Sequence, residues 1–269
     1  MRLTTLALLL LAFGCASKQK TPAEKALDVH YNYGTEFLMN KNYTEAITQL
    51  LKAVEIAPEN PEVHNNLGMA YYFKGEKASA ERHIRRALAL DAKNTDARNN
   101  LASLRFEAGD LAEAERLYKE CLKDLTYEKQ ARVYFNLSLI AQRQGNRANT
   151  ESYLRLSLKE DDSYCPAWFQ LGQFEYQARD LKQALKNFRE AGMGMCANDP
   201  APLYWQGVVL GEMGDTLAAR MKFDELETRF PRTSFAVQAR EQISRLNLHE
   251  SHPAPANRAG RGGVTTPTY

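Results

Sequence analysis

A spacing of 34 residues between similar positions is the feature that most constrains how this chain can fold. Gly68 follows Gly34 by 34 residues, and each glycine has a large residue directly before it and an aromatic residue three positions after it. Alanine stands twelve residues beyond each glycine, at Ala46 and Ala80. Because a period of this length is typical of stacked supersecondary units that bury their apolar faces against one another, we expect one array of helix pairs.

The same pattern recurs along most of the chain and resembles the tetratricopeptide repeat, in which small residues mark the close crossing of two antiparallel helices. The resemblance predicts an all-α fold, a right-handed superhelical solenoid of six repeats over residues 26–248, with a capping helix at its end. The fourth unit departs most from the pattern, because Ser138, Thr150 and Ser157 replace small apolar residues. From residue 249 onward proline and glycine accumulate with few apolar residues, so residues 249–269 are predicted to be a disordered tail.

The first fourteen residues are typical of a bacterial export signal. Arg2 precedes the apolar run Leu6 to Leu11, and small residues lead up to Cys15. This arrangement resembles a lipoprotein signal, which implies that residues 1–14 are removed, that Cys15 is acylated, and that residues 15–25 form a lipidated tether. The alternative is an ordinary secretion signal. In such lipoproteins, aspartate two residues after the acylated cysteine is associated with retention at the inner membrane. Ser17 stands at this position here, so the resemblance favours the outer membrane.

Composition narrows the classes of function. The formal net charge of +2 gives no electrostatic footprint for nucleic acid, which we do not expect as a partner. The apolar run of the leader is much shorter than the roughly 20 residues that span a bilayer. The mature chain is therefore expected to be soluble apart from its anchor.

Two of the four cysteines are placed to form a disulfide. Cys165 and Cys196 fall at the start of the first helix and the end of the second helix of the fifth unit, and antiparallel packing brings these two ends together. We expect the bond to form in an oxidising compartment, where it would contribute about 3 kcal/mol; two reduced thiols are the alternative. Cys121 is expected to be a buried thiol. His30 and His64 stand at core positions of the repeat, and His83 has no partner at ligand spacing, so no metal site is predicted.

The inner wall of the array is unusually apolar. Residues expected to face this groove are Tyr31, Leu38, Met69, Tyr72, Phe106, Phe135 and Leu139, together with Phe169 and Tyr176. One interpretation is a hydrophobic groove that receives an amphipathic helix or an extended segment of a partner. The alternative is that inter-repeat packing buries about half of these side chains.

Paired asparagines accompany this apolar wall. Asn65 with Asn66, and Asn99 with Asn100, occupy equivalent positions of consecutive units and could hydrogen-bond the backbone of a bound peptide. Capping and inter-helix bonding are the alternative. No recognisable motif joins a nucleophile, a base and an orienting group, so we expect neither enzymatic activity nor a cofactor.

The lipoprotein signal, the six units and the cysteine pair together are similar to the type IV pilus biogenesis lipoproteins of the PilF, PilW and Tgl type. The resemblance implies an acylated anchor at Cys15 in the lipid of the outer membrane and a repeat domain in the periplasm. It also implies that the protein is a pilotin, which binds type IV pilus secretin subunits and promotes their assembly in the outer membrane. Pilus biogenesis and pilus-dependent motility would depend on this assembly. The protein is expected to be a monomer before it binds the secretin. The competing interpretation is a non-catalytic scaffold or adaptor of a barrel-assembly or cell-wall machine.

Overall fold

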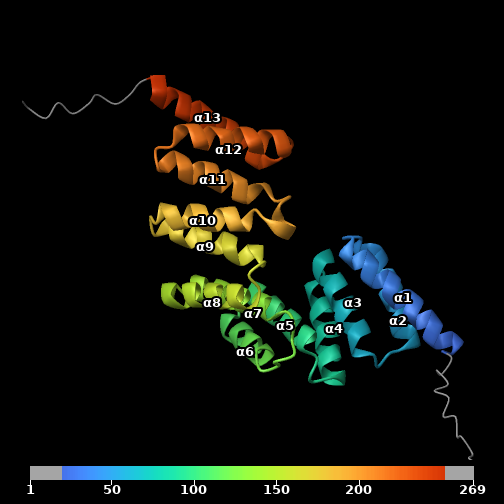
Figure 1. Ribbon diagram of the computed structural model, residues 1–269. Coiled ribbons are helices and arrows are strands. Elements are labelled where there is room, and N and C mark those ends of the chain that lie inside the picture. Colours follow the sequence, from blue (N-terminus) through green and yellow to red (C-terminus); the bar gives the residue numbers. More distant parts are fainter. Residues whose placement is uncertain (1–19, 252–269) are drawn as a thin grey trace, which may run out of the picture. The chain divides into compact units, whose positions relative to one another are not determined.

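The computed structural model describes residues 20–251, which form thirteen α-helices and one short 3-10 helix with no strand in that range. The chain divides into two compact units, Met1–Ala108 and Gly109–Tyr269. The described helices of the first unit are α1 (Pro22–Met39), α2 (Tyr43–Ile56), α3 (Pro61–Lys74), α4 (Lys77–Leu90) and α5 (Thr95–Glu107), as labelled in Figure 1. Those of the second are α6 (Leu111–Cys121), α7 (Gln130–Arg143), α8 (Arg147–Glu160), α9 (Cys165–Gln177), α10 (Leu181–Ala191), η1 (Gly194–Cys196), α11 (Pro200–Glu212), α12 (Thr216–Arg229) and α13 (Ser234–Ser251). The predicted all-α fold of helix pairs is confirmed.

Side-chain caps fix where the helices begin. The amide oxygens of Asn60 and Asn94 accept backbone hydrogen bonds at the starts of α3 and α5, at 3.1 and 2.8 Å. At the end of α3 the chain turns at Gly75, whose φ of +93° favours glycine. These caps place the turns between consecutive helices.

The first helix begins inside the segment predicted as a tether. Thr21 and Glu24 form a capping box, in which the Thr21 hydroxyl accepts from the Glu24 backbone and the Glu24 carboxylate accepts from the Thr21 backbone. Pro22, at the first helical position, is preorganised for a helix. The predicted tether boundary at residue 25 is therefore wrong, because α1 starts at Pro22.

Small residues let the paired helices approach closely. A Cβ atom at Gly172 would lie 2.7 Å from the ring of Phe188, and one at Gly68 would lie 2.6 Å from Ile84. The large side chains that face the glycines, Phe188 and Ile84, are fully buried. The repeat pattern thus corresponds to an actual crossing of α9 with α10 and of α3 with α4.

Buried hydroxyl side chains replace small apolar residues in the divergent fourth repeat. Ser138, Thr150 and Ser157 are buried, and each hydroxyl donates to a backbone carbonyl. The Ser157 hydroxyl donates to Ala131 O on the paired helix at 2.7 Å. Because these polar groups are satisfied, their burial does not carry the cost of an unpaired donor.

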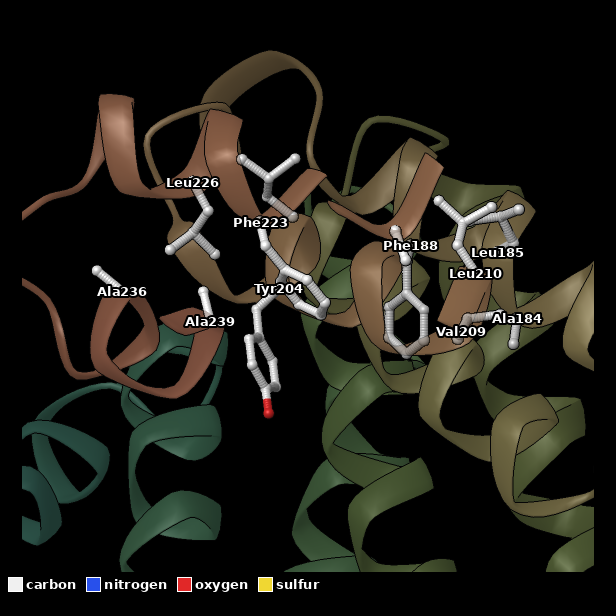
Figure 2. Close-up of a cluster of buried hydrophobic side chains, with 12 residues drawn as sticks. Ala184, Leu185, Phe188, Tyr204, Val209, Leu210, Phe223, Leu226, Ala236 and Ala239 are labelled. Atoms are coloured by element: carbon white, nitrogen blue, oxygen red, sulfur yellow. The ribbon is translucent and has the colours of Figure 1, made fainter. Parts of the chain in front are cut away.

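The last helix covers the end of the second unit. Ala236 and Ala239 of α13 are fully buried against a cluster that includes Phe223, Leu226 and Tyr204 (Figure 2). The predicted capping helix is present, but it continues to Ser251 instead of ending at residue 248. The remainder of the predicted tail lies outside the described residues.

The length and apolar character of the described helices decide whether any of them could span a membrane. Within residues 20–251, none of the helices combines the length and the apolar character needed to cross a bilayer.

Candidate functional site

The first helices of the repeats in the first unit, α1, α3 and α5, lie next to one another. We call their shared surface the first-helix face, and it consists of Tyr31, Thr35, Leu38, Asn65, Asn66, Met69, Tyr72, Asn99, Asn100 and Phe106. Most of the residues predicted to line the groove therefore lie on three adjacent helices of this unit.

The asparagines connect the repeats to one another. Asn66 Nδ2 donates to Tyr31 Oη at 3.2 Å and to Thr35 Oγ1 at 3.0 Å, which ties α3 to α1. Asn100 Nδ2 donates to Asn65 Oδ1 at 2.8 Å, which ties α5 to α3. The amides thus align three first helices, and Thr35 is a member of this network that the sequence interpretation missed.

Burial decides between the two interpretations of the asparagines. Asn65 is 8% exposed and Asn99 is 2% exposed, so neither offers much surface to a bound peptide. Asn99 Oδ1 is buried without a hydrogen-bond partner. The structure therefore favours the inter-helix alternative over direct contact with a peptide backbone.

The apolar side chains of the first-helix face remain partly accessible. Leu38, Met69, Tyr72 and Phe106 are all partly buried, and none is enclosed. Leu38 packs at the edge of the core cluster of the first two repeats. The Tyr72 hydroxyl donates to the Glu107 carboxylate. The face therefore offers apolar surface held in fixed positions.

Acidic residues lie beside this apolar surface. Burial raises the pKa of the Tyr31 hydroxyl, and the negative charges of Glu62 and Asp96 raise it further. Glu107, the acceptor for Tyr72, forms an ion pair with Lys77 at 3.4 Å. Acidic side chains thus lie near the apolar side chains of the first-helix face, and the charge of Glu107 is balanced by Lys77.

In the second unit, the predicted groove residues Phe135 and Leu139 belong to α7 and are partly buried. The Phe135 ring meets the Tyr164 ring edge-on, with centroids 5.7 Å apart, and packs against a cluster containing Leu154 and Leu171. Phe135 therefore contributes to packing between repeats, as the alternative interpretation expected for part of the set.

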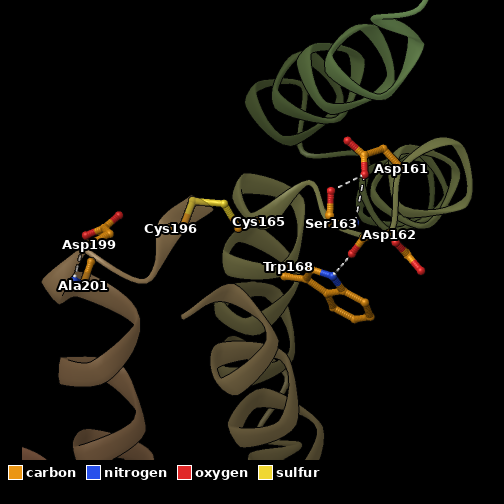
Figure 3. The surroundings of a disulfide bond; sticks show 8 residues. All are labelled: Asp161, Asp162, Ser163, Cys165, Trp168, Cys196, Asp199 and Ala201. Atoms are coloured by element: carbon orange, nitrogen blue, oxygen red, sulfur yellow. Dashed lines mark hydrogen bonds between the residues drawn. A yellow bond between two sulfur atoms is a disulfide. The ribbon is translucent and has the colours of Figure 1, made fainter. Parts of the chain in front are cut away.

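The cysteine pair is bonded in the structure. Cys165 and Cys196 form a disulfide with a Cα–Cα distance of 6.2 Å, which links the start of α9 to η1 (Figure 3). On the far side of η1, the Asp199 carboxylate caps α11 by accepting from Ala201 N at 2.9 Å. Cys121 is a free, buried thiol. The bond thus fixes the segment between the fifth and sixth repeats.

Side-chain contacts of two histidines form an unpredicted feature of the first unit. His64 Nδ1 lies 3.1 Å from His83 Nδ1, and the rings stack. His30 makes the equivalent contact with Gln49 Oε1 at 2.8 Å, over the same separation of 19 residues. Burial and the neighbouring His64 lower the pKa of His83 to about 4. Within residues 20–251, no group of three or more His, Cys, Asp or Glu side chains could hold a metal ion.

Two family models match the chain. The model described as TPR repeat matches residues 28–75, and the model described as Tetratricopeptide repeat matches residues 65–128. No curated protein matches the chain by sequence.

Solved structures with the same fold extend the match over most of the chain. PilF of Pseudomonas aeruginosa is 22% identical with a TM-score of 0.68, over 82% of this chain and 100% of that one. PilW, a widely conserved type IV pilus biogenesis factor, is 19% identical with a TM-score of 0.68, over 80% and 98%. The Cut9–Hcn1 structure is 15% identical with a TM-score of 0.60, over 84% and 47%. The chain therefore contains tetratricopeptide repeats within residues 28–128 and shares the fold of PilF and PilW. Cys15 lies outside the described residues.

Proposed function

We propose that this tetratricopeptide repeat protein is an outer-membrane lipoprotein that binds type IV pilus secretin subunits and promotes their assembly. The observation that carries the proposal is the first-helix face, where partly exposed apolar side chains stand on helices that the asparagines hold in line. The fold shared with PilF and PilW supports a role in pilus biogenesis.

Binding at this face follows from its physical properties. Met69 and Tyr72 lie three residues apart on α3, so both can contact one helix or strand of a partner. Burying apolar surface there contributes about 25 cal/mol per Å². Because the hydrogen bonds of Asn66 and Asn100 already order the supporting helices, binding costs less conformational entropy than it would on a mobile surface.

The anchor supplies the second part of the proposal. Only six residues separate Cys15 from Pro22, where α1 begins. Fully extended, this stretch reaches about 25 Å. If Cys15 is acylated, the first unit stays beside the membrane, and a captured secretin subunit experiences a raised effective concentration at the surface it must enter.

Substitutions at the first-helix face test the proposed binding. Met69→Gln combined with Tyr72→Gln is expected to abolish co-purification with the secretin and the formation of secretin multimers in the outer membrane. Leu51→Gln on α2 is the matched control, because Leu51 is also an exposed apolar residue of the first unit but lies on a second helix. Secretin binding that survives the double substitution would contradict the proposed site.

A separate variant tests the anchor. Cys15→Ala behind a cleavable secretion signal is expected to leave secretin binding intact and to reduce assembly in the membrane. Unchanged assembly would remove the tethering step. Capture of a barrel-assembly subunit or a cell-wall enzyme in place of the secretin would favour the scaffold interpretation.

A further inference from the structure

A pocket of about 430 Å³ lies between α11 and α13 in the second unit. Its volume falls within the roughly 300–1,000 Å³ of ligand-binding pockets. The sequence explains why the space exists, because the twelfth position of the first helix is Gly211 in the sixth repeat. The earlier repeats have larger side chains there, namely Leu38, Tyr72, Phe106, Gln142 and Tyr176.

One wall of the pocket is aromatic. The Trp205 ring meets the Tyr176 ring edge-on with centroids 5.2 Å apart and stacks on Phe188 at 5.7 Å. Tyr204 lines the pocket beside it, and Figure 2 shows its hydroxyl oxygen pointing away from Leu226. These contacts fix the rings in place, so the wall is preformed for an apolar side chain.

The pocket lining also contains charged and polar side chains, namely Glu212 on α11 and Gln238, Gln242 and Arg245 on α13. Glu212 accepts from the Tyr176 hydroxyl and forms an ion pair with Arg179 at 2.5 Å, so its charge is balanced. Arg245 forms no ion pair with the other described side chains. Gln238 and Gln242 stand one helical turn apart on α13, and both line the pocket.

We propose that this pocket binds a peptide segment of a partner protein, with an aromatic side chain against Trp205 and an adjacent Asp or Glu paired with Arg245. The charge of Arg245 selects the acidic residue, and the space left by Gly211 accepts the ring. The side-chain amides of Gln238 and Gln242 each offer a hydrogen-bond donor and an acceptor. A peptide backbone can bond to both groups, whereas the hydrocarbon chain of a fatty acid can bond to neither. The site is in the second unit and does not depend on the proposed secretin binding.

Fluorescence of Trp205 gives a direct assay. The chain contains two tryptophans, so Trp168→Phe leaves Trp205 as the only reporter. The probe is the synthetic peptide Gly-Ser-Phe-Asp-Gly-Ser, titrated into the full chain carrying this substitution. We expect a saturable change in emission. Arg245→Glu is expected to weaken binding by at least about tenfold, as the loss of a charge-assisted hydrogen bond implies.

Matched variants separate the pocket from general effects of charge and folding. Arg240→Glu changes the net charge equally on the same helix, outside the pocket lining, and is expected to leave the affinity unchanged. A Cβ atom at Gly211 meets only ordinary contacts, 3.8 Å from Ala219 Cβ and Leu246 Cδ2. Gly211→Ala should therefore retain binding, whereas Gly211→Phe should fill the pocket and abolish it, with the helical circular dichroism of both variants intact.

Four results with the peptide would overturn the proposal. They are an unchanged Trp205 emission at millimolar peptide, equal binding of the peptide with Lys in place of Asp, equal weakening by both arginine substitutions, and full binding to Gly211→Phe. Saturable binding of decanoate without any peptide binding would identify a fatty-acid pocket and would equally overturn it. None of these results bears on the secretin, so failure here is distinguishable from failure of the proposed function.

Discussion

Replacing both Cys165 and Cys196 with alanine is expected to destabilise the second unit by at least about 3.5 kcal/mol. The bond joins residues separated by 31 positions. Closing a loop of that length in the unfolded chain removes about 12 cal/mol/K of entropy, which is worth about 3.5 kcal/mol at 25 °C. Alanine is preferable to serine, because Cys165 is buried and a serine hydroxyl there would add a desolvation cost.

Tryptophan fluorescence during urea unfolding isolates the unit concerned. Both tryptophans, Trp168 and Trp205, belong to the second unit, so their emission follows that unit alone. The free energy of unfolding of the unsubstituted chain should be about 3.5 kcal/mol higher in the oxidised form than in the reduced form, because reduction removes only the cross-link.

Two controls make the result decisive. The double alanine variant should be insensitive to reductant. Cys121→Ala should be less stable because it leaves a small cavity, but it should remain sensitive to reductant. Equal urea midpoints for the oxidised and reduced unsubstituted chain would refute the reasoning.

Three further predictions concern the first unit. Gly68→Ala places a Cβ 2.6 Å from Ile84 and should cost about 1–3 kcal/mol in thermal unfolding, and Ile84→Ala in the same chain should relieve part of the overlap. Burial and His64 lower the pKa of His83 to about 4, so His83 binds a proton more readily in the unfolded chain. The free energy of unfolding should therefore fall as the pH drops from about 6.5 to about 4. His83→Gln should reduce this pH dependence, measured as urea midpoints by circular dichroism. Thr21→Ala removes the capping box and should cost about 1 kcal/mol, visible as faster amide hydrogen exchange in the first turn of α1 and unchanged exchange in α3.

Local sequence signals were sufficient to predict the helix pairs. The glycines and alanines of the repeat mark real crossings, since Gly68 and Gly172 leave no room for a Cβ atom. The early start of α1 was also readable, because Thr21, Pro22 and Glu24 form a standard capping signature that the tether interpretation overlooked.

Other features depend on how the helices pack, both within and between repeats, which a single sequence does not specify. The sequence left Asn65 with two interpretations, contact with a bound peptide or an inter-helix hydrogen bond, and it did not identify Asn100 of the next repeat as the partner. The contact between His64 and His83 likewise follows from the crossing of α3 with α4. The pocket at Gly211 could have been noticed as a missing large side chain, although its second wall comes from the capping helix.

Photo-crosslinking from the first-helix face tests the central claim most directly. A benzophenone amino acid placed at Met69 in cells that assemble pili is expected to crosslink to the secretin, and the same amino acid at Leu51 on α2 is expected not to do so. A secretin adduct from Leu51 with none from Met69 would contradict the account.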